Sequence, residues 1–232
     1  ATFVSPLASD PDALRASAAS PECETALAAL NQLVRDRALI GRVDRVELSK
    51  NLLRGFLAYG DLLQRYPAHR GRVVFVAGAY PSRQGVPGYA AYRDAIEQAV
   101  AEINERFGTT DWTPVVLDVD DDFPRSVALL RRADVLLVNP IRDGLNLVAS
   151  EGPLVSDREV VLALSPEAGA WERLHPAALS VPPFDIAGTA DVLHQALTMP
   201  ADERTRRFTL LRSLAEGRTP RDWLADQLAA AT

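Results

Sequence analysis

The feature that most constrains the fold is a series of short apolar runs that alternate with helix-like segments. The middle runs are nearly continuous in Val, Leu and Ile, which is typical of strands buried on both faces of a parallel sheet. The runs are ATFVSP (1–6), ALIGRV (38–43), VVFVAGA (73–79), TPVVLDV (113–119), VLLVNP (135–140) and EVVLALSP (159–166), with a shorter ALSVPP (178–183).

The segments between and after these runs have the spacing of helices. In the segment 50–66, for example, Leu52, Phe56 and Leu63 belong to an apolar stripe at helical intervals. We interpret the Ala/Ser/Pro-rich stretch 8–22 as a surface segment. The predicted helices cover about 22–35, 50–66, 87–107, 124–132, 146–154, 169–174, 188–197, 200–216 and 220–231.

Strands that alternate with helices predict βαβ units and therefore an α/β fold. Because the sequence shows neither an internal repeat nor a low-complexity linker, we expect one domain over residues 1–232. Its simplest architecture is a doubly wound parallel sheet followed by C-terminal helices.

Composition excludes several other classes of protein. The chain has 232 residues, of which 47% are hydrophobic and 24% are charged, as in ordinary globular proteins. Its net charge of −6 argues against a nucleic-acid binder that relies on overall positive charge. The single cysteine, Cys23, cannot form an internal disulfide, which favours the cytoplasm.

Targeting and membrane segments are also not expected. No apolar run approaches the roughly 20 residues that a membrane-spanning helix needs. The sequence starts without Met and without a basic region, so we expect no signal peptide and interpret the chain as a piece of a longer protein.

Ligands of doubly wound sheets bind beyond the carboxyl ends of the strands, and the segment IRDGLNLVASE (141–151) lies at such a position. Gly144 permits a tight turn and close backbone approach, and Asn146 can cap the following helix. Free N–H groups at that helix start favour an anion such as a phosphate. Glu151 could accept hydrogen bonds from a ribose diol. A capped, packed helix with a surface glutamate explains the segment equally well.

Two cations follow the run at 38–43. Lys50 is the one lysine among 25 basic residues, and it lies at a predicted helix start, where a cation opposes the helix dipole. Together with Arg45 in the preceding loop, it could stabilise the charge that grows on a diphosphate leaving group. The alternative is a solvated Lys50 and an Arg45 paired with Asp44 or Glu47. Arg83 could likewise bind phosphate or cap a neighbouring turn.

Metal, nucleophile and dinucleotide sites are not expected. The acidic run 118–122 resembles a metal site, but we interpret it as a mostly solvated loop in which Asp122 caps the helix 124–132. His69, His175 and His194 lie far apart in sequence and are interpreted as surface or hydrogen-bonded residues. There is neither a nucleophile-elbow motif nor a G-x-G-x-x-G fingerprint.

Four strings in this order resemble the trehalose-6-phosphate synthase family, which is glycosyltransferase family 20. They are RVDRVELSKNLLRGFLAY (42–59), YPSRQGVPGYAAYR (80–93), LLVNPIRDGLNLVASEG (136–152) and LSPEAGAWERL (164–174). The resemblance runs from about residue 36 to the C-terminus. It implies half of a GT-B fold, namely the Rossmann-like C-terminal domain that binds the donor, with the N-terminal acceptor domain absent from this chain.

The resemblance also implies residue roles. Arg45 and Lys50 match the pair that grips the donor diphosphate, Arg83 matches an arginine of the donor-side loop, and Glu151 matches the carboxylate that binds the nucleotide ribose. The loop and helix start that hold the sugar and phosphates of the donor correspond to Asp143, Gly144, Leu145, Asn146, Leu147 and Val148.

The implied function is retaining transfer of a glycosyl group from a UDP- or GDP-linked sugar to a sugar phosphate. The donor is a substrate, so no cofactor is expected. The implied partner is the N-terminal domain of the same protein, with a second copy of the chain as an option, and neither nucleic acid nor membrane is expected.

Two alternatives stay open at this point. The set SKN, YPSRQ and NPIRDG resembles an actinobacterial branch that includes validoxylamine 7'-phosphate synthase. That enzyme is a pseudo-glycosyltransferase, which couples a GDP-linked cyclitol to an aminocyclitol phosphate. The other alternative is a domain that binds a nucleotide sugar without catalysis.

Overall fold

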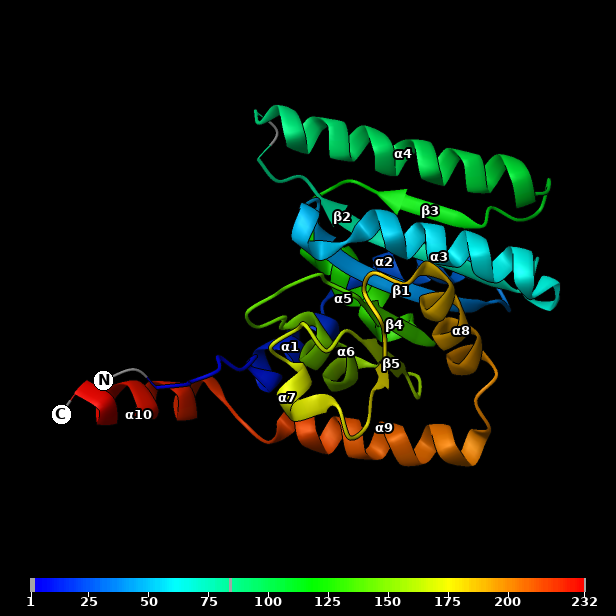
Figure 1. The fold of residues 1–232 in the computed structure, drawn as a ribbon. Helices are drawn as coiled ribbons and strands as arrows, with labels where there is room; N and C mark the ends of the chain where they lie inside the picture. The colour runs from blue at the N-terminus through cyan, green and yellow to red at the C-terminus, as the bar shows by residue number, and fades with distance from the viewer. Residues whose placement is uncertain (1–2, 84, 232) are drawn as a thin grey trace.

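The chain folds around one parallel sheet of six strands in the order β3-β2-β1-β4-β5-β6 (Figure 1). The structure is a computed structural model that describes residues 3–83 and 85–231. The strands are β1 (Ala38–Arg45), β2 (Val73–Tyr80), β3 (Val115–Asp118), β4 (Val135–Val138), β5 (Val161–Leu164) and β6 (Leu179–Ser180). The predicted α/β fold with a doubly wound parallel sheet is therefore confirmed.

Strand β1 lies in the middle of the sheet and pairs with both β2 and β4. Its partners on β2 run in register from Ala38 opposite Val73 to Arg45 opposite Tyr80. Strands β1, β2 and β3 follow one another toward one edge of the sheet. The chain then crosses back, and β4 pairs with β1 on the side opposite β2. This is the switch point at which open α/β sheets bind ligands.

Helices cover both faces of the sheet. One face carries α3 (Leu52–Arg65), α4 (Pro87–Phe107) and α8 (Ile186–Leu197), and the other carries α2 (Pro21–Val34), α5 (Phe123–Arg132) and α6 (Val148–Val155) (Figure 1). Small residues allow the close packing: a Cβ on Gly41 of β1 would lie 3.0 Å from the Ala133 side chain beside α5. The remaining helices are η1 (Leu48–Lys50), η2 (Pro67–His69), α1 (Pro11–Ala18), α7 (Trp171–Leu174), α9 (Ala201–Glu216) and α10 (Pro220–Ala231).

The N-terminal region differs from the prediction. Residues 3–10 form no strand, so the strand predicted over 1–6 is wrong where the structure describes it, and its first two positions lie outside the described residues. The predicted surface segment contains helix α1 instead. Asp10 caps this helix by accepting the N–H groups of Asp12 and Ala13 at 3.0 and 3.1 Å, and Pro11 occupies the first turn. Leu14 is buried beneath the helix.

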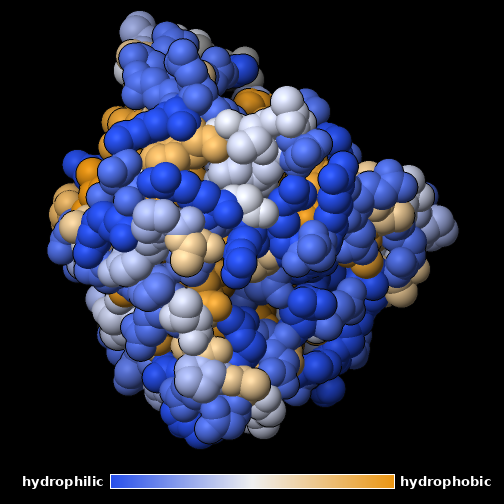
Figure 2. All heavy atoms as spheres, turned by 90° about the vertical axis from the view of Figure 1, so that its right-hand side faces the viewer, coloured by the Kyte–Doolittle hydropathy of each residue, from blue (hydrophilic) through white to orange (hydrophobic). Residues whose placement is uncertain are grey.

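The carboxyl and amino ends of the strands lie on opposite sides of the molecule. The strands point their carboxyl ends to the left in Figure 1, where most of the polar loops of the sequence analysis lie. Figure 2 shows the other end, toward which the amino ends of the strands point, and this face is mostly hydrophilic with scattered apolar residues. Among the described residues, no helix is long and apolar enough to span a membrane.

Candidate functional site

The loops that follow β1, β4 and β5 meet at the carboxyl edge of the sheet. Ile141 donates its N–H to the Ser49 carbonyl at 2.8 Å, which ties the loop after β4 to η1. The N–H of Asp143 donates to the Glu167 carbonyl at 3.1 Å, and Gly169 donates to the Asp143 carbonyl at 2.9 Å. Segments that are about 100 residues apart in sequence thus form one backbone frame.

Lys50 lies inside this frame. Its Nζ is 2.6 Å from Oδ2 of Asp143 and 3.6 Å from Oδ1 of Asp44. It ends η1 just before α3, as the predicted position at a helix start requires. Only 15% of the side chain is exposed, so the alternative of a solvated lysine is wrong.

The carboxylates on either side keep Lys50 charged. Burial alone would lower the pKa of Lys50, but Asp44 and Asp143 outweigh burial and raise it. Burial opposes ionisation of Asp143 as well, yet the ammonium of Lys50 and the amide of Asn146 bring the pKa of Asp143 below its usual value. The site therefore presents an ionised lysine whose position is fixed by two carboxylates.

Asn146 shapes the turn into α6. Its φ of 62° places it in the left-handed region, which the short polar side chain of asparagine tolerates. Its Nδ2 donates to Oδ2 of Asp143 at 3.1 Å, and its Oδ1 accepts the N–H of Ala149 at 3.2 Å. The predicted capping role of Asn146 is thereby confirmed.

The close backbone approach predicted for Gly144 depends on a different glycine, Gly169, in the loop after β5. A Cβ on Gly169 would lie 2.1 Å from the Gly144 carbonyl oxygen, so Gly169 is the residue that allows the two loops to touch. A Cβ on Gly144 would meet nothing within 4 Å. The residue with positive φ in this turn is Asn146, and Gly144 instead borders open space.

The residues between Gly144 and α6 offer mainly backbone groups. Leu145 donates its N–H to Oδ1 of Asp143 at 3.4 Å, and its carbonyl accepts the N–H of Ala170 at 2.8 Å. Leu147 and Val148 stand at the helix start, where N–H groups precede the intrahelical hydrogen bonds and carry the positive end of the helix dipole. The anion site expected at this helix start stays a prediction, which rests on the backbone N–H groups that precede Ala149.

Glu151 lies in the first turn of α6 and is partly buried. Its Oε1 accepts a hydrogen bond from the Ser9 hydroxyl at 3.1 Å. Burial raises the pKa of Glu151, and the hydrogen bond from Ser9 opposes that effect. The alternative of a purely surface glutamate is wrong, because the segment before α1 crosses over this carboxylate.

Arg45 is the last residue of β1 rather than a loop residue, because β1 extends two residues beyond the predicted run. Its guanidinium is half exposed and pairs with Oε1 of Glu47 at 2.9 Å. The Ser82 hydroxyl donates to the same oxygen at 3.0 Å. Arg45 is near enough to Lys50 that its charge lowers the pKa of the lysine, so the two cations do share one edge.

Arg83 lies on the exposed loop between β2 and α4, with φ 46°. Its Nη1 donates to the Tyr89 hydroxyl at 3.3 Å, and its guanidinium lies 5.6 Å from the centroid of the Tyr89 ring. Tyr89 also borders a hollow of about 350 Å³ together with Val46 and Ser82. The described contacts do not join Arg83 to Lys50 or Asp143.

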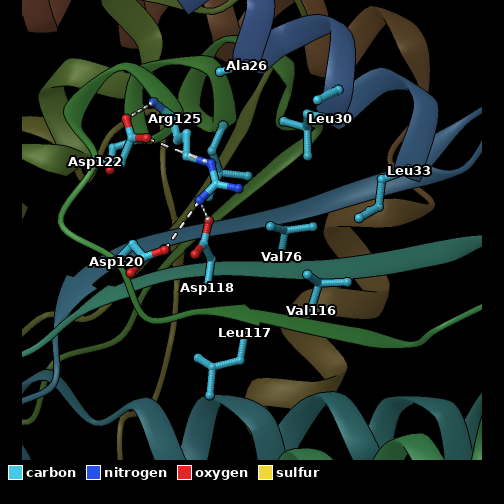
Figure 3. A pocket seen from close by; sticks show the side chains of 14 residues that line it. Ala26, Leu30, Leu33, Val76, Val116, Leu117, Asp118, Asp120, Asp122 and Arg125 are labelled. Carbon is cyan, nitrogen blue, oxygen red and sulfur yellow. Dashed lines mark hydrogen bonds and ion pairs between the residues drawn. The ribbon is translucent and has the colours of Figure 1, made fainter.

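The acidic run after β3 surrounds a cation of the chain itself. In Figure 3, Asp118, Asp120 and Asp122 converge on Arg125 at 3.0, 3.6 and 3.9 Å, at the mouth of a cavity of about 330 Å³ between α2 and α5. Asp122 also caps α5 by accepting the Arg125 N–H at 3.0 Å, as predicted. In residues 3–83 and 85–231, no group of three His, Cys, Asp or Glu side chains is placed to hold a metal ion.

The histidines are hydrogen-bonded, as predicted, although two of them lie together. Nε2 of His69 is 2.9 Å from Nδ1 of His194, and the ring of Tyr66 stacks on His194 at 3.9 Å between centroids. His175 donates from Nδ1 to the Trp171 carbonyl at 3.1 Å. The His69–His194 pair lies between η2 and α8, away from Lys50.

Comparison with known proteins shows to which family the chain belongs. The sequence profile of glycosyltransferase family 20 matches residues 1–232. The chain belongs to glycosyltransferase family 20. Trehalose-6-phosphate synthase of Klebsiella pneumoniae is 36% identical to it over 228 residues, which cover 97% of this chain and 48% of the relative.

Solved family 20 structures are similar along nearly the whole chain. A trehalose-6-phosphate protein from E. coli bound with UDP-2-fluoro glucose is 33% identical, with a TM-score of 0.91 over 99% of this chain and 51% of that one. A UDP-forming trehalose-phosphate synthase from Burkholderia xenovorans in complex with glucose-6-phosphate is 34% identical, with a TM-score of 0.91 over 98% and 51%. The chain thus spans about half the length of these family 20 proteins.

Sequence reasoning missed three buried polar residues that lie around Lys50. Arg42 and Asp44 lie on β1 and Asn139 follows β4, and all three are less than 10% exposed. A charge inside the apolar run ALIGRV was the available signal for Arg42, because a buried central strand has little use for an arginine. Ser9 was also missed, since nothing in its local sequence connects it to Glu151.

Proposed function

We propose that this chain forms the donor-binding half of a trehalose-6-phosphate synthase. The whole protein would transfer a glucosyl group from a nucleotide diphosphate sugar to glucose 6-phosphate. The observation that carries the proposal is Lys50, which Asp44 and Asp143 hold at the switch point of the sheet. Gly144, the residue after Asp143, borders open space.

Each sequence-predicted residue has a role in this proposal. Lys50 and Arg45 neutralise the donor diphosphate, and Arg83 adds a cation from the adjacent loop. Glu151 accepts hydrogen bonds from the ribose diol. The sugar and phosphates of the donor lie against the loop and helix start formed by Asp143, Gly144, Leu145, Asn146, Leu147 and Val148.

The chemistry needs no nucleophile from the protein. As the bond between the anomeric carbon and the diphosphate oxygen breaks, the leaving oxygen gains negative charge and accepts the proton of the acceptor hydroxyl. That hydroxyl oxygen forms the new glycosidic bond on the same face, so configuration is retained. Lys50 and Arg45 stabilise the charge on the leaving group, which is where preorganised cations lower a barrier most.

The relatives support UDP-glucose as donor and glucose 6-phosphate as acceptor, because the similar E. coli and Burkholderia proteins bind a UDP-sugar analogue and glucose-6-phosphate. The pseudo-glycosyltransferase alternative gains little from Asn51, the last residue of the SKN string. Asn51 has the left-handed φ of 63° that glycine would also adopt, and its Nδ2 donates to the carbonyls of Asn139 and Pro183. Its role is thus explained by backbone geometry.

Calorimetric titration of the chain with UDP, GDP and ADP tests the proposal. We expect UDP to bind best and the Arg45→Ala/Lys50→Ala variant to lose most of that binding. The variant Arg158→Ala/Arg206→Ala, which removes the same charge from exposed positions elsewhere, is the matched control. Absence of nucleotide binding, or equal loss in the control, would reject the donor site, and selective GDP binding would favour the pseudo-glycosyltransferase.

A further inference from the structure

Arg42 is a fully buried arginine at the centre of the sheet. It lies on β1, the strand between β2 and β4, and its exposed fraction is 0%. The side chain points toward α3, because a Cβ on Gly55 of that helix would lie 2.7 Å from Nη1 of Arg42. Gly55 therefore provides the space that the guanidinium occupies.

The guanidinium joins three segments beneath Lys50. Its Nη2 lies 2.9 Å from Oδ2 of Asp44 and also donates to the main-chain carbonyl of Lys50. Its Nη1 donates to Oδ1 of Asn139, in the loop that leads to Asp143. A planar fork with several donors suits such a task better than an ammonium does.

Stability alone does not explain this buried ion pair. Arg42 and Asp44 are an ion pair removed from water, and such a pair is commonly no more stabilising than well-packed apolar residues. Within the described residues, Nε of Arg42 and Nδ2 of Asn139 are buried without a hydrogen-bond partner. An unpaired buried donor destabilises the folded state, because it has lost its hydrogen bonds to water. A valine or isoleucine would suit a central strand better, so a requirement of the site accounts for the arginine.

We propose that Arg42 is a positioning residue that fixes Lys50 for the donor diphosphate. The inference rests on the proposed function, because it assumes that Lys50 contacts that diphosphate. By occupying Oδ2 of Asp44, Arg42 leaves only Oδ1 for Lys50, whose Nζ then sits closer to Asp143 than to Asp44. By binding the Lys50 carbonyl, it also fixes the end of η1.

Loss of Arg42 would move Lys50 inward. Asp44 would remain buried with Lys50 as its remaining cation from the cluster, and the ammonium would be drawn from Asp143 toward Asp44. Asp143 borders the turn at Gly144, so this shift withdraws the charge from the open space where the diphosphate is proposed to bind.

The single lysine allows a direct test. In protein labelled with ¹³C-lysine, the side-chain spectrum contains signals of Lys50 alone, because no other lysine exists in the chain. We expect Arg42→Gln to shift the Lys50 Cε signal, to abolish its response to UDP and to weaken UDP binding by about tenfold. Arg42→Lys should restore part of the response, since an ammonium can pair with Asp44 but cannot also reach both other acceptors.

Gly55→Ala provides a second variant that keeps all charges. Alanine favours the helix, but its Cβ would crowd the Arg42 guanidinium. We therefore expect a smaller shift of the Lys50 signal and a smaller loss of UDP affinity than in Arg42→Gln. If Arg42→Gln does not fold, this variant decides. An unchanged Lys50 signal with unchanged UDP affinity in the folded variants would overturn the positioning role. A wild-type chain that binds no UDP would instead contradict the proposed function, and the Lys50 Cε signal would then show only whether Arg42 positions Lys50.

Discussion

Two clusters of charge stand at opposite ends of the same central strands. At the amino end, Asp134 precedes β4 and accepts from Arg132 at 2.9 Å, from Arg158 at 3.1 Å and from the Leu39 N–H at 2.8 Å. At the carboxyl end, Lys50 stands between Asp44 and Asp143. Both clusters join β1 to β4, but the first has two cations around one carboxylate and the second has two carboxylates around one cation.

This difference in composition distinguishes a structural cluster from a proposed binding cluster. In the amino-end cluster one carboxylate has donors on both oxygens, including a backbone N–H, so its hydrogen bonds are complete within the fold. In the carboxyl-end cluster two carboxylates share one ammonium, and Gly144, the residue after Asp143, borders open space. In the proposed function this ammonium also donates to the incoming diphosphate. The difference teaches that an ion pair indicates a site only when one member can still bind something else.

The largest expected effect on stability belongs to the amino-end cluster. Asp134→Ala leaves Arg132 without its carboxylate partner and removes the acceptor of the Leu39 N–H in a mostly buried place, so we expect the free energy of unfolding to fall by about 3 kcal/mol. Urea unfolding measures this change. UDP affinity of the folded protein should be unaffected, and a loss of UDP binding without a loss of stability would erase the distinction between the clusters.

The carboxyl-end cluster should respond in the opposite way. Lys50→Ala removes a charge-assisted contact to the diphosphate worth ~2 kcal/mol, so UDP should bind about thirtyfold more weakly in calorimetry. The free energy of unfolding should fall by less than in Asp134→Ala, because Asp44 keeps Arg42 and Asp143 keeps the amide of Asn146 as partners. Arg158→Ala, which removes a cation from the other cluster, is the control and should leave UDP affinity unchanged.

Glu151 gives a smaller and more specific effect. Glu151→Gln should weaken UDP binding by about tenfold, because a neutral amide accepts the ribose hydrogen bonds less strongly. It should also reduce the preference for UDP over 2′-deoxy-UDP. Glu159→Gln is the matched control, since Glu159 also accepts from a hydroxyl, that of Thr205 at 2.9 Å, at the amino end.

The protonation of Glu151 gives the same test a pH dependence. Burial raises the pKa of Glu151 above its ordinary value. UDP affinity should therefore fall as the pH falls through that raised pKa, because the proton removes the acceptor charge. If Glu151→Gln retains the same acidic loss, the ribose contact is not made by Glu151.

The sheet could be predicted because buried parallel strands leave nearly continuous apolar runs, as at 73–79 and 135–140. The capping hydrogen bonds of Asn146 and Asp122 were equally local, since each side chain accepts a backbone N–H three residues ahead. The strand predicted at 1–6 failed because apolar residues alone do not supply a partner strand.

The contacts that complete the site were out of reach for a different reason. Lys50 meets Asp143 across 93 residues, and Ser9 meets Glu151 across 142. Such pairs depend on the order of strands in the sheet, which a single sequence does not encode in any short pattern. Arg42 was visible as a misplaced charge, but its partners were not.

The smallest expected effect concerns the pair His69–His194, a polar contact that belongs to neither cluster. Burial, together with the neighbouring His194, lowers the pKa of His69 below its ordinary value of about 6.5. The unfolded chain then binds a proton more readily than the folded chain, so stability is complete above pH 6.5 and declines as the pH falls below it. Between pH 7.5 and 5.5, His69→Gln should reduce the decrease in melting temperature by about 1–2 °C. If the melting temperature has the same pH dependence in wild type and variant, folding does not change the pKa of His69. UDP affinity at pH 7.5 should be the same in both proteins, because this pair lies away from Lys50.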